Sequence, residues 1–463
     1  MAATTPLPRR DLLRWPLLGR LLRARRGRLW LQLPLFLWAA LIIYDGFTGP
    51  QLPVENLATI SVWLHYRGFV VLALLLAGNL FCMACPFALP RTVAHRLSRA
   101  GWRWPRALRQ KWLAIAAFVL LLLLYEWLDL WASPWLTVWV AIAYFAGAFI
   151  FEALFSESAF CKYVCPLGTF NFLGAAISPA QITVHDRDIC RTCPGKECVN
   201  GSPDVLGCGT LLFPPQMASN LDCVFCLDCA RACPYENVAL APRSSLAELS
   251  NPASWPLRWD LGLLALVFAF SALGNAFGMV PPFYALLDRL GALPEWLSLL
   301  LIFGAIDLLL PALLGFAAAL LSRARTPGQE PLRHPFGRYA PTSLPLAFAI
   351  WLAHYGFHFA TGALALVPAL HAFLLDHALP LAGRPDWTLS AILPFSWLLP
   401  LQILVTLLGL GASLVVLDRR ARAAGGVAHG AHLPWTLLWL LLALAAVYLF
   451  ALPMQMRGTT FMP

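Results

Sequence analysis

The chain has 463 residues, of which 60% are hydrophobic and only 12% are charged, and its mean hydropathy is +0.69. A water-soluble protein of this length needs far more charged surface, so the composition excludes that class and predicts a membrane protein. The 33 Lys and Arg residues exceed the 23 Asp and Glu residues, which gives a net charge of +10. Because the basic residues lie in loops between apolar stretches, they predict membrane orientation, and we do not expect nucleic acid as a partner.

Nine apolar stretches are each close to the length of about 20 residues that a helix needs to cross a bilayer. They begin near Trp30, Val62, Trp112, Trp135, Leu261, Leu297, Leu344, Ile392 and Pro434. The pattern predicts an all-α polytopic membrane protein with about nine transmembrane helices. The long polar interruption between the fourth and fifth stretches, residues 181–243, predicts a small insert outside the membrane.

Lys and Arg residues alternate between the loops of this pattern. The basic segments are 1–28, 91–111, 323–338 and 419–422. The segments with at most one basic residue are 44–61, 281–295 and 369–387. Since positively charged loops remain in the cytoplasm, we expect a multi-pass protein of a bacterial-type inner membrane. Its N-terminus and insert are expected in the cytoplasm and its C-terminus outside.

Two short cysteine motifs end the second and fourth apolar stretches. Cys82-x2-Cys85 and Cys161-x3-Cys165 are each preceded by phenylalanine and followed by proline. Their matching positions predict a parallel repeat whose four thiols meet near its axis at the cytoplasmic edge of the membrane. There they would bind a further iron–sulfur or iron centre, such as a [2Fe–2S] cluster. The alternative is that proline ends each helix and cysteine packs as a small apolar residue.

The other eight cysteines lie in the insert, and four of them form a known pattern. Cys223-x2-Cys226-x2-Cys229-x3-Cys233, followed by proline, is the bacterial ferredoxin run. In that run the first three cysteines bind one [4Fe–4S] cluster and the fourth binds the neighbouring cluster. A zinc site is the alternative for four cysteines at such spacing. The insert therefore predicts two [4Fe–4S] clusters.

The upstream half of the insert supplies the remaining thiols, at Cys190, Cys193, Cys198 and Cys208. The exchange of the fourth ligand between clusters predicts two sets of four. These sets are Cys190, Cys193, Cys198 with Cys233, and Cys223, Cys226, Cys229 with Cys208. Spacing alone leaves open an exchange of roles between Cys198 and Cys208.

Membrane cysteine-proline pairs followed by a double ferredoxin run resemble the membrane-bound polyferredoxins of the NapH/NosR type. The resemblance covers roughly residues 62–240. It implies a 4Fe–4S ferredoxin-type integral membrane protein in which the eight insert cysteines bind clusters and the membrane pairs have a redox role. Proteins of this type link quinol oxidation, cytoplasmic redox donors or metal-cofactor maintenance to partner enzymes.

Four parts of the chain follow from these features. They are a basic cytoplasmic tail (1–28), a four-helix membrane domain with the paired Cys-Pro motifs (29–180), a ferredoxin-like iron–sulfur domain (181–243) and a five-helix membrane domain (244–463). The last part has the weakest local signals for function.

Polar residues within the last part suggest further sites. His354 and His358 lie four residues apart on one helical face, where they would bind a metal or help to bind a haem. The alternatives for this pair are hydrogen bonds within the bundle and a quinone pocket. Asp307, within the sixth apolar stretch, is a candidate for proton relay or for a hydrogen bond to another helix. C-terminal thioethers, at Met454, Met456 and Met462, are candidate ligands of cuprous ion, although interfacial methionines without a function are common.

Together these features predict a membrane electron-transfer protein. We expect it to relay electrons between a cytoplasmic redox partner protein and quinone or an outer acceptor, as part of a larger redox complex. It would be a quinol dehydrogenase-like component and not a stand-alone enzyme, so no catalytic residue is predicted. The alternative is a reductive maturation factor that supplies electrons for metal-cofactor assembly in a partner enzyme.

Overall fold

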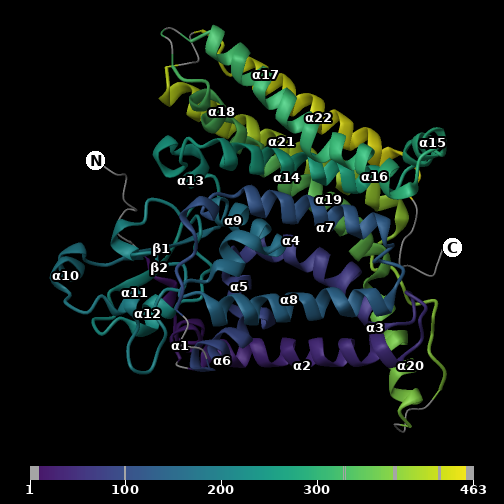
Figure 1. Cartoon of the computed structure of the whole chain (residues 1–463), viewed down its shortest axis with the longest axis horizontal. Helices are drawn as coiled ribbons and strands as arrows, with labels where there is room; N and C mark the ends of the chain where they lie inside the picture. Colours follow the sequence, from purple (N-terminus) through teal and green to yellow (C-terminus); the bar gives the residue numbers. More distant parts are fainter. Residues whose placement is uncertain are drawn as a thin grey trace. The chain divides into compact units, whose positions relative to one another are not determined.

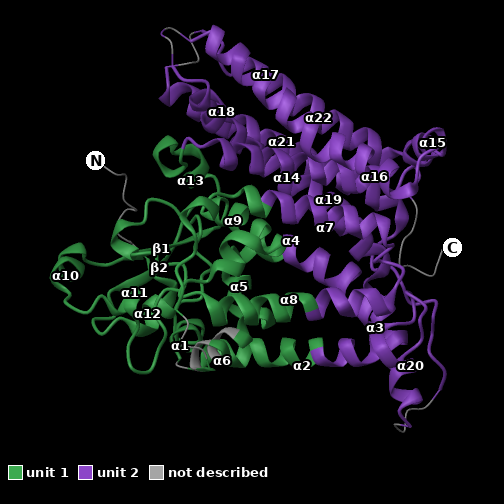
Figure 2. Ribbon diagram, viewed as in Figure 1, with its two compact units in different colours: residues 1–39, 73–114, 143–256 green, residues 40–72, 115–142, 257–463 purple. Residues whose placement is uncertain are grey.

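The computed structural model of the chain describes residues 10–454 apart from 25, 98–100, 327, 329, 379–382 and 426–428. It divides into two compact units (Figure 2). Unit 1 comprises residues 1–39, 73–114 and 143–256, and unit 2 comprises residues 40–72, 115–142 and 257–463. These units cut across the four parts predicted from the sequence, because several helices of the first half begin in one unit and end in the other.

Eight helical stretches in the described chain are long and apolar enough to cross a membrane (Figure 1). In chain order they are α2 (Gly27–Thr48), Leu57–Ala77 with α4 (Arg67–Ala77), α8 (Pro134–Leu154), α14 (Trp259–Phe277), Glu295–Ala324 with α16 (Glu295–Gly304) and α17 (Leu310–Ala324), Arg333–Asp376 with α18 (Arg333–Tyr339), α19 (Leu344–Gly362) and α20 (Leu366–Asp376), α21 (Phe395–Ala423) and α22 (Leu433–Ala451). By length and composition, the chain is a multi-pass helical membrane protein.

The third predicted span is shorter than the others. It forms α7 (Trp112–Trp127), an apolar helix of 16 residues. At a rise of 1.5 Å per residue this helix is about 24 Å long, which is less than the roughly 30 Å of a hydrocarbon core. The structure therefore supports eight of the nine predicted spans by length and composition.

Unit 2 is a bundle in which α14 is the most deeply buried of the spans (Figure 1). It packs against α17, α19 and α22, and α19 packs along α21. A Cβ added at Gly409 of α21 would lie 2.3 Å from the Cβ of Ala349 in α19. Glycine is needed at this contact because small residues let membrane helices approach closely.

Three π-helical turns interrupt helices of the described chain: η2 (Ile60–Tyr66), η5 (Phe160–Val164) and η8 (Ala305–Leu309). Such turns are rare and occur frequently at functional sites. Each contains or adjoins an ionisable side chain. Arg67 directly follows η2, Cys161 lies in η5 and Asp307 lies in η8.

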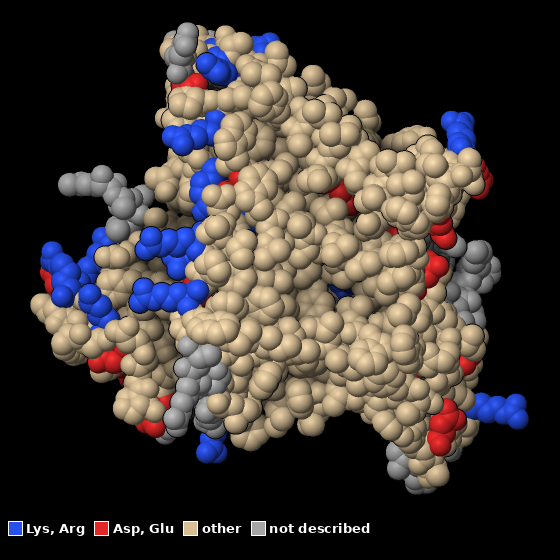
Figure 3. Space-filling model, in the orientation of Figure 1, with Lys and Arg blue, Asp and Glu red and all other residues tan. Residues whose placement is uncertain are grey.

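Basic side chains gather at one end of each unit (Figure 3). In unit 1 they surround α10 (Arg187–Thr192) and the neighbouring loops. In unit 2 they lie where α17, α18 and α21 have their arginines. Two of these helices are in contact there, since Arg420 of α21 donates a hydrogen bond to the carbonyl oxygen of Arg338 of α18 at 2.7 Å. This clustering is the pattern that the positive-inside rule describes.

The insert of unit 1 is built on one small sheet. Strands β1 (Ala180–Val184) and β2 (Val238–Pro242) pair antiparallel, with Ile182 opposite Leu240. Three short helices, α10, α11 (Glu197–Asn200) and α12 (Asp228–Ala232), lie in the chain between the two strands. The buried side chains of the sheet pack with Phe225 into an apolar cluster. Although polar in composition, the insert therefore has a small core.

The N-terminal segment contributes to this core. Leu13 and Leu22 are 3% and 4% exposed and pack in the same apolar cluster as the sheet. The carboxylate of Asp11 accepts hydrogen bonds from the backbone N–H groups of Leu13 at 2.9 Å and Leu240 at 3.1 Å. Residues 10–24 thus pack on the insert, whereas the sequence predicted a separate basic tail; residues 1–9 lie outside the described chain.

Replacing Leu13 with alanine is expected to loosen this segment. A buried leucine truncated to alanine lowers the free energy of unfolding by about 2–5 kcal/mol. The matched control is Leu17→Ala in the same segment: Leu17 is 84% exposed, and we expect a change of less than about 0.5 kcal/mol. Limited proteolysis of the N-terminal segment and thermal unfolding measure both variants. Equal effects of the two substitutions would contradict the packing described above.

Candidate metal centres

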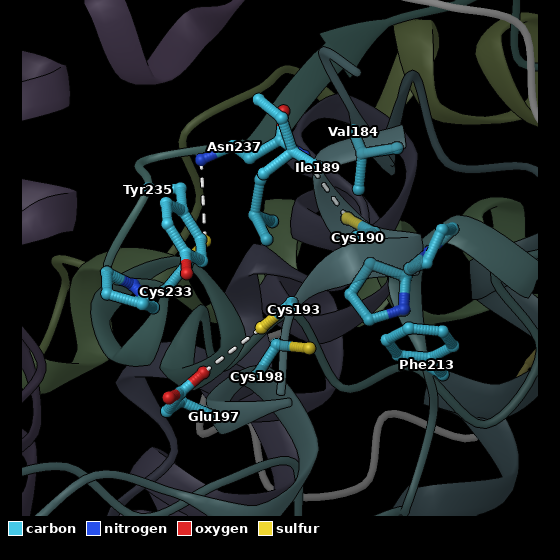
Figure 4. Close-up of a pocket in the computed structure, with 14 residues that line it drawn as sticks. Val184, Ile189, Cys190, Cys193, Glu197, Cys198, Phe213, Cys233, Tyr235 and Asn237 are labelled. Atoms are coloured by element: carbon cyan, nitrogen blue, oxygen red, sulfur yellow. Dashed lines mark hydrogen bonds between the residues drawn. The ribbon is translucent and has the colours of Figure 1, made fainter. Parts of the chain in front are cut away.

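Four cysteines line a hollow in the insert (Figure 4). Its volume is about 330 Å³, counting the opening to solvent. We call this set group A: Cys190 in α10, Cys193 at the end of α10, Cys198 in α11 and Cys233 at the end of α12. The four thiols are close enough to act on one another electrostatically.

Asn237 donates two hydrogen bonds to group A (Figure 4). Its side-chain amide donates to Cys190 Sγ at 3.1 Å, and its backbone N–H donates to Cys233 Sγ at 3.4 Å. Such donors stabilise a thiolate. Burial has the opposite effect and raises the pKa of Cys190. At Cys198, burial and the three other thiols of the group together raise the pKa to about 12, and burial is the larger cause. A bound cation resolves this conflict, because it binds the thiolate and neutralises its charge.

A second set of thiols lies around α12 and the loops before it. We call it group B: Cys208, Cys223, Cys226 and Cys229. Burial raises the pKa of both Cys223 and Cys229, and the other thiols of the group raise it further. The backbone N–H of Leu212 donates a hydrogen bond to Cys208 Sγ at 3.3 Å. Group B therefore combines buried sulfur atoms with a backbone donor, as group A does.

The memberships of groups A and B match the two sets of four predicted from the ferredoxin run. Cys233 lies with the upstream cysteines, and Cys208 lies with the downstream ones. Cys198 lies with Cys190 and Cys193, whereas Cys208 lies with Cys223, as in the first of the two assignments. Binding of clusters by either group stays a prediction.

The loops that present these thiols contain unusual backbone conformations. Six of the eight described non-glycine residues with positive φ lie in the insert: Lys196, Leu211, Asp222, Phe225, Leu227 and Glu236. Such conformations are costly for residues with a side chain and are concentrated at functional sites. Phe225 and Leu227 flank Cys226, so the backbone has a positive φ on both sides of this residue. No sequence signal marks these residues, since glycine or asparagine is the usual choice.

Four thiols can bind either an iron–sulfur cluster, which spreads its cysteine ligands over several irons, or one tetrahedral zinc ion with Zn–S bonds of about 2.3 Å. In the part of the chain that the structure describes, no three His, Cys, Asp or Glu side chains converge closely enough to hold one ion. The choice of a cluster over zinc stays a prediction.

The cysteines of the two Cys-Pro motifs form a third set, group C: Cys82 in α5 (Leu80–Ala84), Cys85 at its end, Cys161 in η5, and Cys165 before α9 (Pro166–Ala176). Burial raises the pKa of Cys82, and the three other thiols of the group and Cys223 raise it further. Burial also raises the pKa of Cys165 to about 12. The two motifs therefore lie together as the repeat predicted, and metal binding by group C remains a prediction.

Polar contacts join group C to group B. The side-chain amide of Asn79, three residues before Cys82, donates to the carbonyl oxygen of Cys223 at 2.8 Å. Lys111 Nζ donates to Asp222 Oδ1 at 2.8 Å and to the carbonyl oxygen of Lys162 at 2.7 Å. Asp222 directly precedes Cys223, and Lys162 directly follows Cys161. These contacts fix the two groups as neighbours, and sequence reasoning did not find them.

All twelve cysteines lie in unit 1 and belong to groups A, B and C. No protein-family model, curated protein or solved structure matches the chain.

The histidine pair of unit 2 is buried in α19. His354 and His358 are 1% and 6% exposed, and their ring centroids lie 5.0 Å apart. Their predicted position on one helical face is confirmed, whereas metal or haem binding stays a prediction. Another histidine of unit 2, His377, directly follows α20. Its ring nitrogens make hydrogen bonds with the Tyr44 hydroxyl at 3.1 Å and with the Phe373 carbonyl oxygen at 2.8 Å. Of the candidate copper ligands, Met456 and Met462 lie outside the described residues.

Proposed function

We propose that the chain is a membrane-bound electron-transfer protein whose insert holds two [4Fe–4S] clusters, one in group A and one in group B. The observation that supports this proposal most strongly is the division of eight insert cysteines into two sets of four. When bound, the clusters would supply one-electron carriers. The residues of the insert bury the thiols and orient hydrogen-bond donors toward them, which tunes the potential of such centres.

We propose further that group C holds an additional iron–sulfur or iron centre. Its thiols are buried or partly buried, and buried unpaired thiolates are unfavourable without a cation. Cys82 lies near Cys223 of group B, so group C is the set of donors next to the insert. Asn79, Lys111 and Lys162 hold this neighbourhood together.

The proposed topology has nine spans, with α7 counted as a span despite its length. A short hydrophobic helix is accommodated by local thinning of the bilayer at modest cost. The N-terminus and insert then face the cytoplasm and the C-terminus faces outward, as expected for a bacterial-type inner membrane. Labelling of cysteines introduced at Arg106 and Glu55 from either side of vesicles checks this; reaction of both from one side would contradict it.

The expected partners are a cytoplasmic redox protein and quinone or an outer acceptor, within a larger complex. The test uses the full chain in liposomes that contain quinone, with a reduced one-electron donor added on the insert side. We expect quinone reduction, and we expect its loss in a Cys226→Ala variant of group B. The matched control is Ser254→Ala, a buried residue of unit 1 in η7 (Pro252–Ser254).

Reductive maturation of a partner enzyme is the second candidate function. Two results together would favour maturation over electron relay to quinone. The first is that the protein with intact clusters does not reduce quinone in liposomes. The second is that a deletion strain of the host contains a partner enzyme that lacks its metal.

A further inference from the structure

Asp307 is a carboxyl group in the interior of unit 2. It lies in η8, twelve residues from the start of the 30-residue stretch Glu295–Ala324, or about 18 Å along the helix axis. Asp307 is 1% exposed, and no polar group of the described chain lies within 3.5 Å of either carboxyl oxygen in the geometry of a hydrogen bond. An ionised carboxylate in such a place is strongly disfavoured, whereas the neutral acid is tolerated.

One face of α14 is shaped to accept this carboxyl group. A Cβ added at Gly274 would lie 2.3 Å from Asp307 Oδ1, so only glycine leaves room for it. Ser271 and Asn275 lie three residues before and one residue after Gly274, on the same side of the helix. They are 0% and 3% exposed, and among the described residues neither the Ser271 hydroxyl nor the Asn275 amide oxygen makes a hydrogen bond of 3.5 Å or less. The hydroxyl of Ser271 faces the carboxyl group of Asp307.

The same face continues to a second carboxyl group. A Cβ added at Gly278, the residue after α14, would lie 3.2 Å from Glu126 Oε1. Glu126 is 7% exposed and lies at the end of α7. Among the described residues, it is the titratable group that acts electrostatically on Asp307. Ser271, Asn275 and the two carboxyl groups thus form one polar row along α14.

Arg67 lies beside the Glu126 end of this row. Its guanidinium carbon lies 3.9 Å from the ring centroid of Tyr125, 4.6 Å from that of Trp63 and 5.0 Å from that of Tyr355. Three aromatic faces therefore hold the cation within the bundle. Glu126 also acts on this cation electrostatically. The two carboxyl groups have unlike surroundings, since Arg67 acts on Glu126 whereas no cation of the described chain acts on Asp307.

We propose that Asp307 is a proton-binding site in the membrane interior, and that it exchanges protons with Glu126 through the polar row that Asn275 and Ser271 line. Two titratable groups whose surroundings favour opposite protonation states are the arrangement from which acid and base roles follow. The cation beside Glu126 favours the carboxylate, which accepts a proton from the end of the bundle. The burial of Asp307 away from water favours the neutral acid, which retains the proton. This role lies in unit 2 and is independent of the clusters proposed for unit 1.

Infrared spectroscopy of the full-length protein in lipid nanodiscs tests the proposal. Near neutral pH we expect a carbonyl band of a protonated carboxyl group that shifts in heavy water. The band should be lost in Asp307→Asn and retained in Glu295→Gln, which removes an exposed carboxyl group at the start of the same helical stretch. Persistence of the band in a folded Asp307→Asn variant would overturn the proposal.

Two further variants keep the proposal testable if Asp307→Asn does not fold. Gly274→Ala places a methyl group against Asp307 Oδ1, so the band should move in frequency without being lost. Glu126→Gln removes the entry carboxylate, so the shift in heavy water should develop more slowly. An unchanged band in Gly274→Ala together with unchanged exchange in Glu126→Gln would overturn both the site and the route.

Discussion

Replacing Cys233 with alanine is expected to remove the cluster of group A and to leave that of group B in place. Proximity in the sequence alone would place Cys233 in group B, because only three residues separate it from Cys229 of that group. Cys233 nevertheless interacts electrostatically with Cys190 and Cys198 of group A. Asn237 also donates hydrogen bonds to the sulfur atoms of both Cys233 and Cys190. Paramagnetic resonance of the reduced full-length protein should show the loss of one of two cluster signals.

The matched control for this prediction is Cys229→Ala. It lies one helical turn earlier in the chain, on α12, but belongs to group B. We expect it to remove the other signal and to spare that of group A. Loss of the same signal in both variants would show that ligands follow chain order and that the fourth cysteine is not exchanged.

The second large effect is expected at group C. Cys161→Ala removes one of its four thiols, and a centre that depends on four ligands should lose its iron. We expect the iron content per chain to fall while the paramagnetic signals of groups A and B persist, because their ligands are unchanged. Thr169→Ala, a buried residue one turn after Cys165, is the matched control and should retain all iron.

The outcome at group C separates two interpretations of the Cys-Pro motifs. If Cys161→Ala leaves iron content unchanged in a folded protein, these cysteines serve as packing residues and helix ends. Loss of iron together with both insert signals would mean that group C is needed for the fold of unit 1 and would leave its metal binding unsupported.

Local patterns predicted the parts of the molecule that depend on short stretches of sequence. The spacing of Cys223, Cys226 and Cys229 and the matched Cys-Pro motifs indicated which thiols lie together, because ligands of one centre are brought close by tight turns. The length of the apolar stretches indicated the helices, since a helix that spans a membrane satisfies its backbone hydrogen bonds within one short segment. Neither pattern required knowledge of distant residues.

Contacts between distant residues could not be predicted in this way. The packing of Leu13 on the insert and the ion pair of Lys111 with Asp222 join segments far apart in the chain. The helix that contains Arg67 also begins earlier than the predicted Val62, at Leu57, because Asn56 caps it through a hydrogen bond from Ala58 N. Arg67 therefore lies midway along the stretch Leu57–Ala77.

The central claim is that groups A and B each hold a [4Fe–4S] cluster. The most direct measurement is the iron and acid-labile sulfide content, under anaerobic conditions, of the full-length protein with its four group C cysteines replaced by alanine. The account predicts about eight irons and about eight sulfides per chain. A content near four irons, or zinc in place of iron, would contradict it.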